Sequence, residues 1–136
     1  MWIVLGAALF LASSAGAAQD VDLSDIFGGG ALEGEALAKA TVEAAQYPLG
    51  SDLNPIRVNM PEGQRNYLSR LRCENGKKPK FSRDGSAGGG PFGSIVDVYT
   101  VDCRKSAPGK VAVFMDMYHP DHREANAVPG FTIVAD

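Results

Sequence analysis

The sequence lacks most of the motifs from which an enzymatic activity is inferred. It has no Gly-x-Ser-x-Gly motif, which would present a nucleophilic serine at a sharp turn. Its glycine-rich segment, residues 84–93, lacks the Gly-Lys-Ser/Thr ending of a nucleotide-binding loop. Basic and aromatic residues are not interleaved as in RNA-binding modules, and the formal net charge is −3. These absences argue against a serine hydrolase, a nucleotide-binding loop and a nucleic-acid partner.

The chain also lacks an apolar run long enough to cross a bilayer as a helix, which takes about 20 residues. A shorter apolar run, residues 2–12, is followed by small residues. Ala15-Gly16-Ala17 has the small side chains that signal peptidase requires before its cut, although no Lys or Arg precedes the run. We therefore predict a signal peptide at residues 1–17, a periplasmic or secreted protein, and no stable membrane span after cleavage. The alternative is a buried N-terminal helix.

Cysteine is scarce, and Cys73 and Cys103 are the only pair available. In an oxidising compartment an even cysteine count favours a disulfide, worth about 3 kcal/mol for a loop of this length. We therefore predict a Cys73–Cys103 disulfide; the alternatives are a metal pair or two free thiols. Export also argues against a cysteine–histidine nucleophile, because that mechanism needs a reduced thiolate.

The pattern of apolar residues predicts an α+β, mainly β fold in a chain of one-domain length. Residues 18–53 form an acidic segment with an Ala-rich helix at about 31–46. Residues 54–136 form a β-rich domain, in which we expect an antiparallel meander of about five short strands and a loop at 84–93. The strands are expected at 67–73, about 78–81, 94–103, 110–118 and 131–134. Alternation of side chains favours a strand at 67–73 over the alternative, a helix, and Asn75-Gly76 then predicts a hairpin turn.

Charge is unevenly distributed along the chain. Residues 20–53 carry 7 acidic and 1 basic side chains, whereas residues 57–83 carry 8 basic and 2 acidic ones. In the expected hairpin, one face presents a cationic patch composed of Arg70, Arg72, Lys78 and Lys80. The patch predicts a non-catalytic exported domain, without a cofactor, that binds an anionic envelope or protein partner. The alternatives are a solvated edge strand and an intramolecular contact with the acidic segment.

Both histidines of the chain lie in one polar segment, residues 116–124. Imidazoles three residues apart, with carboxylates nearby, converge on a divalent metal such as zinc if the segment turns. The second functional hypothesis is therefore a metal-binding or metal-dependent hydrolytic domain that uses His119, His122 and Glu124, with Asp116 in support. Against it, Pro120 interrupts regular structure and the spacing matches no established metal motif. The plainer alternative is a polar loop that follows a strand.

Overall fold

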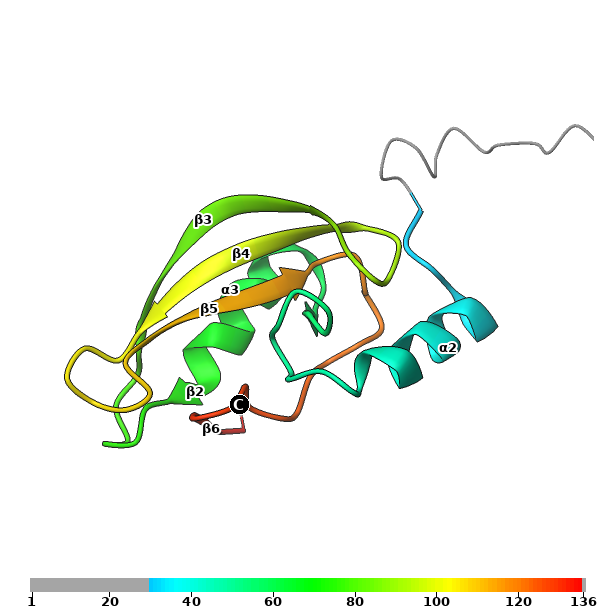
Figure 1. The fold of residues 1–136 in the computed structure, drawn as a ribbon. Helices are drawn as coiled ribbons and strands as arrows, with labels where there is room; N and C mark the ends of the chain where they lie inside the picture. The colour runs from blue at the N-terminus through cyan, green and yellow to red at the C-terminus, as the bar shows by residue number, and fades with distance from the viewer. Residues whose placement is uncertain (1–29, 136) are drawn as a thin grey trace, which may run out of the picture.

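A four-stranded mixed sheet organises the computed structural model, which describes residues 30–135. In spatial order its strands are β1 (Ile56–Arg57), β5 (Lys110–Asp116), β4 (Ile95–Asp102) and β3 (Lys80–Gly89). Figure 1 shows β5, β4 and β3 side by side. The β3–β4 and β4–β5 pairs are antiparallel, and β1 pairs with β5 in parallel. The mainly β, α+β fold class is therefore confirmed. The predicted signal peptide and the first part of the acidic segment lie outside the described residues.

Strands β4 and β5 confirm the two predicted strands that are richest in valine. β-Branched residues favour the extended backbone, and both strands have a neighbour on each side. Along β4, Asp97, Tyr99 and Val101 are buried. Because side chains alternate along a strand, these three share one face of the sheet. Gln64, in the helix Met60–Arg70, forms hydrogen bonds with Asp97 and Tyr99, so this helix packs on that face.

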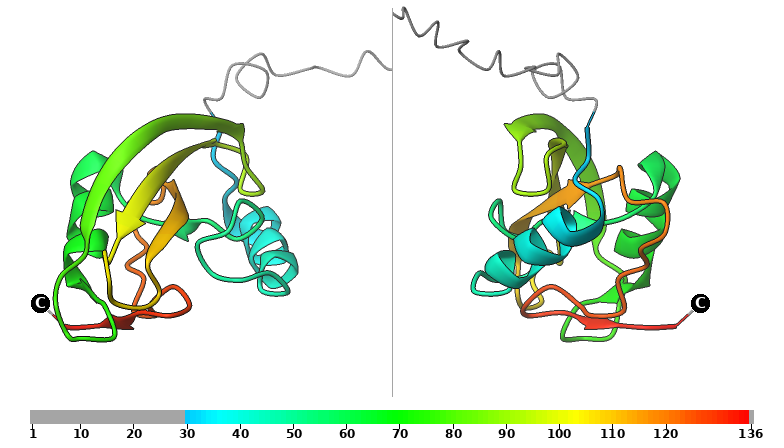
Figure 2. Two further views of the ribbon diagram at one scale, coloured as in Figure 1. Left: turned by 60° about the vertical axis from the view of Figure 1, so that its left-hand side comes forward. Right: turned by 90° about the vertical axis from the view of Figure 1, so that its right-hand side faces the viewer.

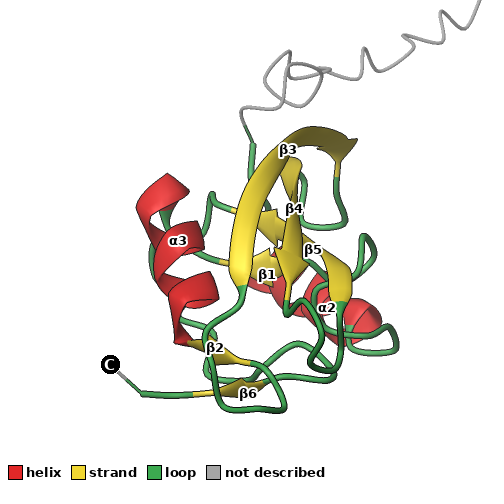
Figure 3. Cartoon of the chain, turned by 90° about the vertical axis from the view of Figure 1, so that its left-hand side faces the viewer, coloured by secondary structure: helices red, strands yellow, loops and turns green. Residues whose placement is uncertain are grey.

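Two helices lie on opposite sides of the sheet, α2 (Gly34–Ala44) and α3 (Met60–Arg70) (Figure 2, Figure 3). Helix α2 confirms the helix predicted at 31–46. It is held through its buried Ala44 and through a hydrogen bond from Leu32 N, in the segment before it, to Phe92 O (2.8 Å). Helix α3 buries Gln64, Tyr67 and Leu68.

The strand predicted at 67–73 is wrong for residues 67–70, because the helix α3 continues to Arg70, and only Leu71–Arg72 form a strand. Pro61 lies in the first turn of this helix, a position that suits proline. The buried residues 64, 67, 68 and 71 follow a helical spacing of three to four. The segment 67–73 is too short for its side-chain pattern to distinguish the period of a helix from the period of a strand.

The meander topology is also corrected by the structure. Strand β2 (Leu71–Arg72) pairs with β6 (Thr132–Ile133) in a separate antiparallel sheet, and not with the segment after Asn75-Gly76. Strand β3 continues through Gly89, so most of the predicted glycine loop is an edge strand. Its register with β4 shifts between Arg83 and Gly85 and again between Ser86 and Gly89. Such bulges bend a strand, and Figure 2 shows the resulting curvature of β3.

The predicted disulfide is confirmed and joins Cys73, just after β2, to Cys103, just after β4. Both cysteines are buried and belong to the hydrophobic core. The core consists mainly of the following buried side chains: Ile56, Val58, Tyr67, Leu68, Leu71, Tyr99, Val101, Val113, Met115, Val128 and Phe131. Within residues 30–135, no helix is long and apolar enough to cross a membrane.

Candidate functional site

The disulfide holds two turns side by side at the end of the molecule opposite α2 (Figure 1). The first turn, residues 73–77, closes with a hydrogen bond from Cys73 N to Lys77 O (2.9 Å). The second, residues 103–109, closes with one from Cys103 N to Gly109 O (2.8 Å). Two further hydrogen bonds cross between the turns, from Glu74 N to Ala107 O (3.0 Å) and from Asn75 N to Ser106 Oγ (3.1 Å). The turns therefore form one cross-linked frame.

A pocket of about 450 Å³ lies on this frame, and half of the residues that line it are basic. The single acidic residue among the lining residues is Asp102. The basic residues all have exposed side chains and come from both turns and the start of β3: Lys77, Lys78, Lys80, Arg104 and Lys105. We call these five residues the cationic pocket.

The basic groups of the cationic pocket have no partners within residues 30–135: none of the five side chains forms an ion pair or a hydrogen bond there. The Asp102 carboxylate binds the backbone and not one of these basic side chains. Its Oδ1 accepts a hydrogen bond from Arg104 N (2.7 Å). This bond holds Arg104 in the left-handed region, at φ 57°. Uncompensated cations on a rigid frame produce a local positive potential that attracts anions.

The structure divides the cationic patch that the sequence predicted. Lys78 and Lys80 belong to the cationic pocket, whereas Arg70 and Arg72 do not. Arg70 is buried in α3, where its Nη2 donates to Glu124 O (2.8 Å). Arg72 donates from Nη1 to the carbonyl oxygens of residues 69 and 71 at the end of α3 (2.9 and 2.8 Å). Both arginines therefore bind the protein's own backbone, and the common face expected for all four residues does not exist.

Sequence reasoning missed three residues of the cationic pocket, Lys77, Arg104 and Lys105. The signal was present, because Arg104 and Lys105 directly follow Cys103, and Lys77 follows Cys73 by four positions. Once a disulfide is predicted, the residues that flank its two cysteines must be neighbours in space. The charge count, in contrast, treated residues 57–83 as a separate segment and so excluded the second turn.

In the polar segment 116–124, the four residues of the predicted metal site form two separate pairs of side chains. In the first, Asp116 is fully buried and its Oδ2 accepts a hydrogen bond from Ser94 Oγ (2.5 Å). His119 Nε2 lies 3.2 Å from the same oxygen, but the two groups are not aligned for a hydrogen bond. The His119 ring instead packs edge-on against Phe92, with ring centroids 5.5 Å apart. This pair is an internal contact of the core.

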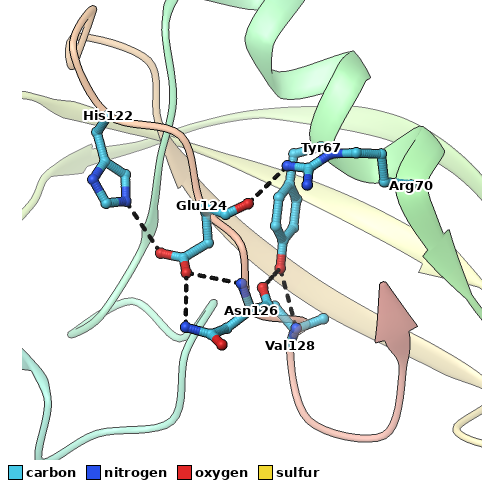
Figure 4. A network of polar contacts seen from close by, with 6 residues as sticks. All are labelled: Tyr67, Arg70, His122, Glu124, Asn126 and Val128. Atoms are coloured by element: carbon cyan, nitrogen blue, oxygen red, sulfur yellow. Dashed lines mark hydrogen bonds and ion pairs between the residues drawn. The ribbon is translucent and has the colours of Figure 1, made fainter. Parts of the chain in front are cut away.

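The second pair is His122 and Glu124, whose Nε2 and Oε2 atoms lie 3.2 Å apart (Figure 4). Glu124 Oε1 also accepts hydrogen bonds from the backbone and side-chain nitrogens of Asn126 (3.1 and 3.3 Å). Beside them, Tyr67 Oη donates to Asn126 O (2.9 Å) and accepts from Val128 N (3.1 Å). Burial raises the pKa of Tyr67 above its ordinary value, so the phenol stays neutral. This network fastens the C-terminal segment to α3.

The structure does not unite the four predicted metal-site residues in one ligand set. In the part of the chain that it describes, no group of three or more histidine, cysteine, aspartate or glutamate side chains is placed to hold a metal ion. His119 faces the core beside Asp116, while the half-exposed His122 pairs with Glu124. The hypothesis of a zinc-dependent domain stays a prediction, without support from a converged site.

Comparison of the chain with models of protein families, with curated protein sequences and with solved structures finds no match. Its function is therefore inferred from its own residues.

Proposed function

We propose that this protein is an exported, non-catalytic domain that binds an anionic partner through the cationic pocket. The observation that carries the proposal is the set of five exposed basic side chains, without ion-pair partners in residues 30–135, around one pocket. The disulfide supports export, because disulfides persist mainly in oxidising compartments. The partner is an envelope polymer or a protein surface that carries several negative charges.

The composition of the cationic pocket indicates the type of anion. Four of its five basic residues are lysines, whose ammonium groups act as point charges on flexible chains. Lysines tolerate several arrangements of phosphate, sulfate or carboxylate groups, whereas arginine favours planar, bidentate geometry. A repeating polyanion suits such a pocket better than a single precisely oriented group.

The proposal is tested by salt elution from a heparin column, with heparin as the probe polyanion. The variant Lys78→Glu/Lys105→Glu is expected to elute at clearly lower salt than the unchanged protein, because two attractive charges become repulsive. The matched control is Lys39→Glu/Arg123→Glu, which alters net charge equally at two exposed residues outside the cationic pocket.

Equal elution of the two double variants would show that net charge alone sets the affinity, and would refute the proposal. A third variant, Arg72→Gln, separates the cationic pocket from the patch predicted from the sequence. Because Arg72 binds backbone carbonyls, its replacement is expected to change heparin elution little.

A further inference from the structure

A second hollow, of about 390 Å³, lies between the first half of α3 and the face of β3 and β4. This volume is at the lower end of the range for small-molecule sites, about 300–1,000 Å³. Its apolar lining consists of Pro61, Phe81, Tyr99 and Met117. Its polar lining consists of Gln64, Arg65, Ser82, Arg83 and Asp97. We call it the α3–β3 hollow; it shares no residue with the cationic pocket.

A chain of hydrogen bonds links three buried side chains of this hollow to its rim. Tyr99 Oη donates to Gln64 Oε1, and Gln64 Nε2 donates to Asp97 Oδ2, both at 2.9 Å. Arg83 Nη2 completes the chain by donating to Asp97 Oδ1 (2.9 Å). Gln64, Asp97 and Tyr99 are 1%, 6% and 5% exposed, so this network is part of the fixed core.

The network holds a guanidinium group at the rim of the hollow. Burial raises the pKa of the Asp97 carboxyl, but hydrogen bonds from Arg83 and Gln64 outweigh that effect and hold the pKa below its ordinary value. The carboxylate therefore stays charged and orients Arg83, whose side chain is 51% exposed. A guanidinium has five N–H donors, and Asp97 is the only hydrogen-bond partner of Arg83 among residues 30–135, so several donors face solvent.

Arg65 adds a second guanidinium from α3. Its side chain is exposed and forms no hydrogen bond or ion pair within the described residues. The lining of the α3–β3 hollow thus carries two basic groups and one acidic group, and the acidic group is already paired with Arg83. A ligand with one negative charge and an apolar body complements both the charge and the lining.

We propose that the α3–β3 hollow binds a small amphiphilic carboxylate, such as a free acid with a short acyl chain. The carboxylate accepts hydrogen bonds from Arg65 and Arg83, and the apolar body lies against Phe81 and Met117. The low net charge of this hollow separates it from the cationic pocket, which has five basic residues and one acidic residue and suits a polyanion. This inference does not depend on the proposed function, because the two sites have no residue in common.

The experiment is a titration of the ¹⁵N-labelled protein with octanoate, and with 1-octanol as the uncharged match. We expect octanoate to shift the backbone signals of Phe81, Arg83 and Tyr99 and to bind about tenfold more tightly than octanol, the effect of one charge-assisted contact. Equal affinity for the two probes, or shifts confined to other parts of the molecule, would overturn the inference.

Variants at the exposed Arg65 test the polar contact without disturbing the buried network. Arg65→Gln is expected to weaken octanoate binding severalfold and to leave octanol binding unchanged, whereas Arg65→Lys keeps most of the affinity. Lys78→Glu/Lys105→Glu, which alters the cationic pocket, is the matched control and is expected to leave octanoate binding intact. An unchanged octanoate affinity in Arg65→Gln contradicts the inference.

Discussion

Two regions of the molecule use basic side chains in opposite ways. At the C-terminal end of α3, Arg70 is only 9% exposed and lies between Glu124 O and the Tyr67 ring (Figure 4). At the disulfide end, five basic side chains are exposed and have no partner in the described residues. The number of cations in a segment therefore does not identify a binding surface, whereas the burial and pairing of each cation do.

The energetic reason is the cost of removing a charge from water. A buried guanidinium must be hydrogen-bonded, so Arg70 acts within the fold. An exposed ammonium keeps its hydration and costs the fold little, so the cationic pocket is free to respond to an external anion. Substitutions at the two regions should therefore separate stability from binding.

The largest effect is expected from removal of the disulfide in Cys73→Ser/Cys103→Ser. The bond closes a sequence separation of 30 residues, and its loss should lower the free energy of unfolding by about 3 kcal/mol. Because the two turns of the cationic pocket lose their covalent link, heparin elution should also move to lower salt. Urea denaturation measures the first effect, and the unchanged protein under reducing conditions should reproduce it. Unaltered stability would contradict the expected role of the bond.

Tyr67→Phe is expected to have the next largest effect. It removes the hydroxyl that bonds Asn126 O and Val128 N and leaves both backbone groups without that partner. The expected loss is about 1–3 kcal/mol in the free energy of unfolding, with heparin binding unchanged. The control is Tyr47→Phe, at a residue that is 44% exposed. Equal stability of the two variants would refute the structural role of this network.

Asp97→Asn should change how stability depends on pH. Since the folded-state pKa of Asp97 is lowered, its ionisation stabilises the fold above the unfolded-state pKa, about 3.9. That contribution is lost as the pH falls below this value and through the folded-state pKa. Asp97→Asn is therefore expected to be less stable at pH 7 and to lose less stability between pH 5 and pH 2. Thermal unfolding at each pH measures this, and Asp52→Asn, at an exposed carboxylate, is the control.

The smallest effect on stability is expected from Lys78→Gln/Lys105→Gln in the cationic pocket. Exposed substitutions of this type usually alter the free energy of unfolding by less than about 0.5 kcal/mol. Heparin elution should nevertheless shift to lower salt. A stability loss as large as that of Tyr67→Phe would mean that these lysines are structural, and the contrast between the two regions would fail.

Sequence patterns correctly predicted the elements whose secondary structure is determined by the residues within the element itself. Strands β4 and β5 contain long valine-rich runs, and α2 contains an alanine-rich one. The errors lie where the pattern is short or ambiguous. Residues 67–71 fit both the helical and the strand period. The glycines of β3 are typical of a loop, although pairing with β4 keeps this segment extended.

The candidate site could be predicted only in part for the same reason. Lys78 and Lys80 could be predicted as site residues because basic side chains are in excess in their part of the sequence. The assignment of Arg70 depended on a hairpin that does not form, and Arg104 joins the site only through the disulfide and the pairing of the two turns. Asp97 was not identified from the sequence, because an aspartate within a strand gives no local sign of a buried partner 33 residues away.

The mainly β fold class, the pairing of the two cysteines and the excess of basic residues before β4 could all be predicted from the sequence alone. These properties depend on composition and on patterns within a few residues. Three other features emerge only from the folded structure: the helix at residues 60–70, the burial of particular arginines and the set of cations that share a pocket. Those outcomes depend on contacts between segments distant in the chain, where burial and hydrogen bonding outweigh local preference.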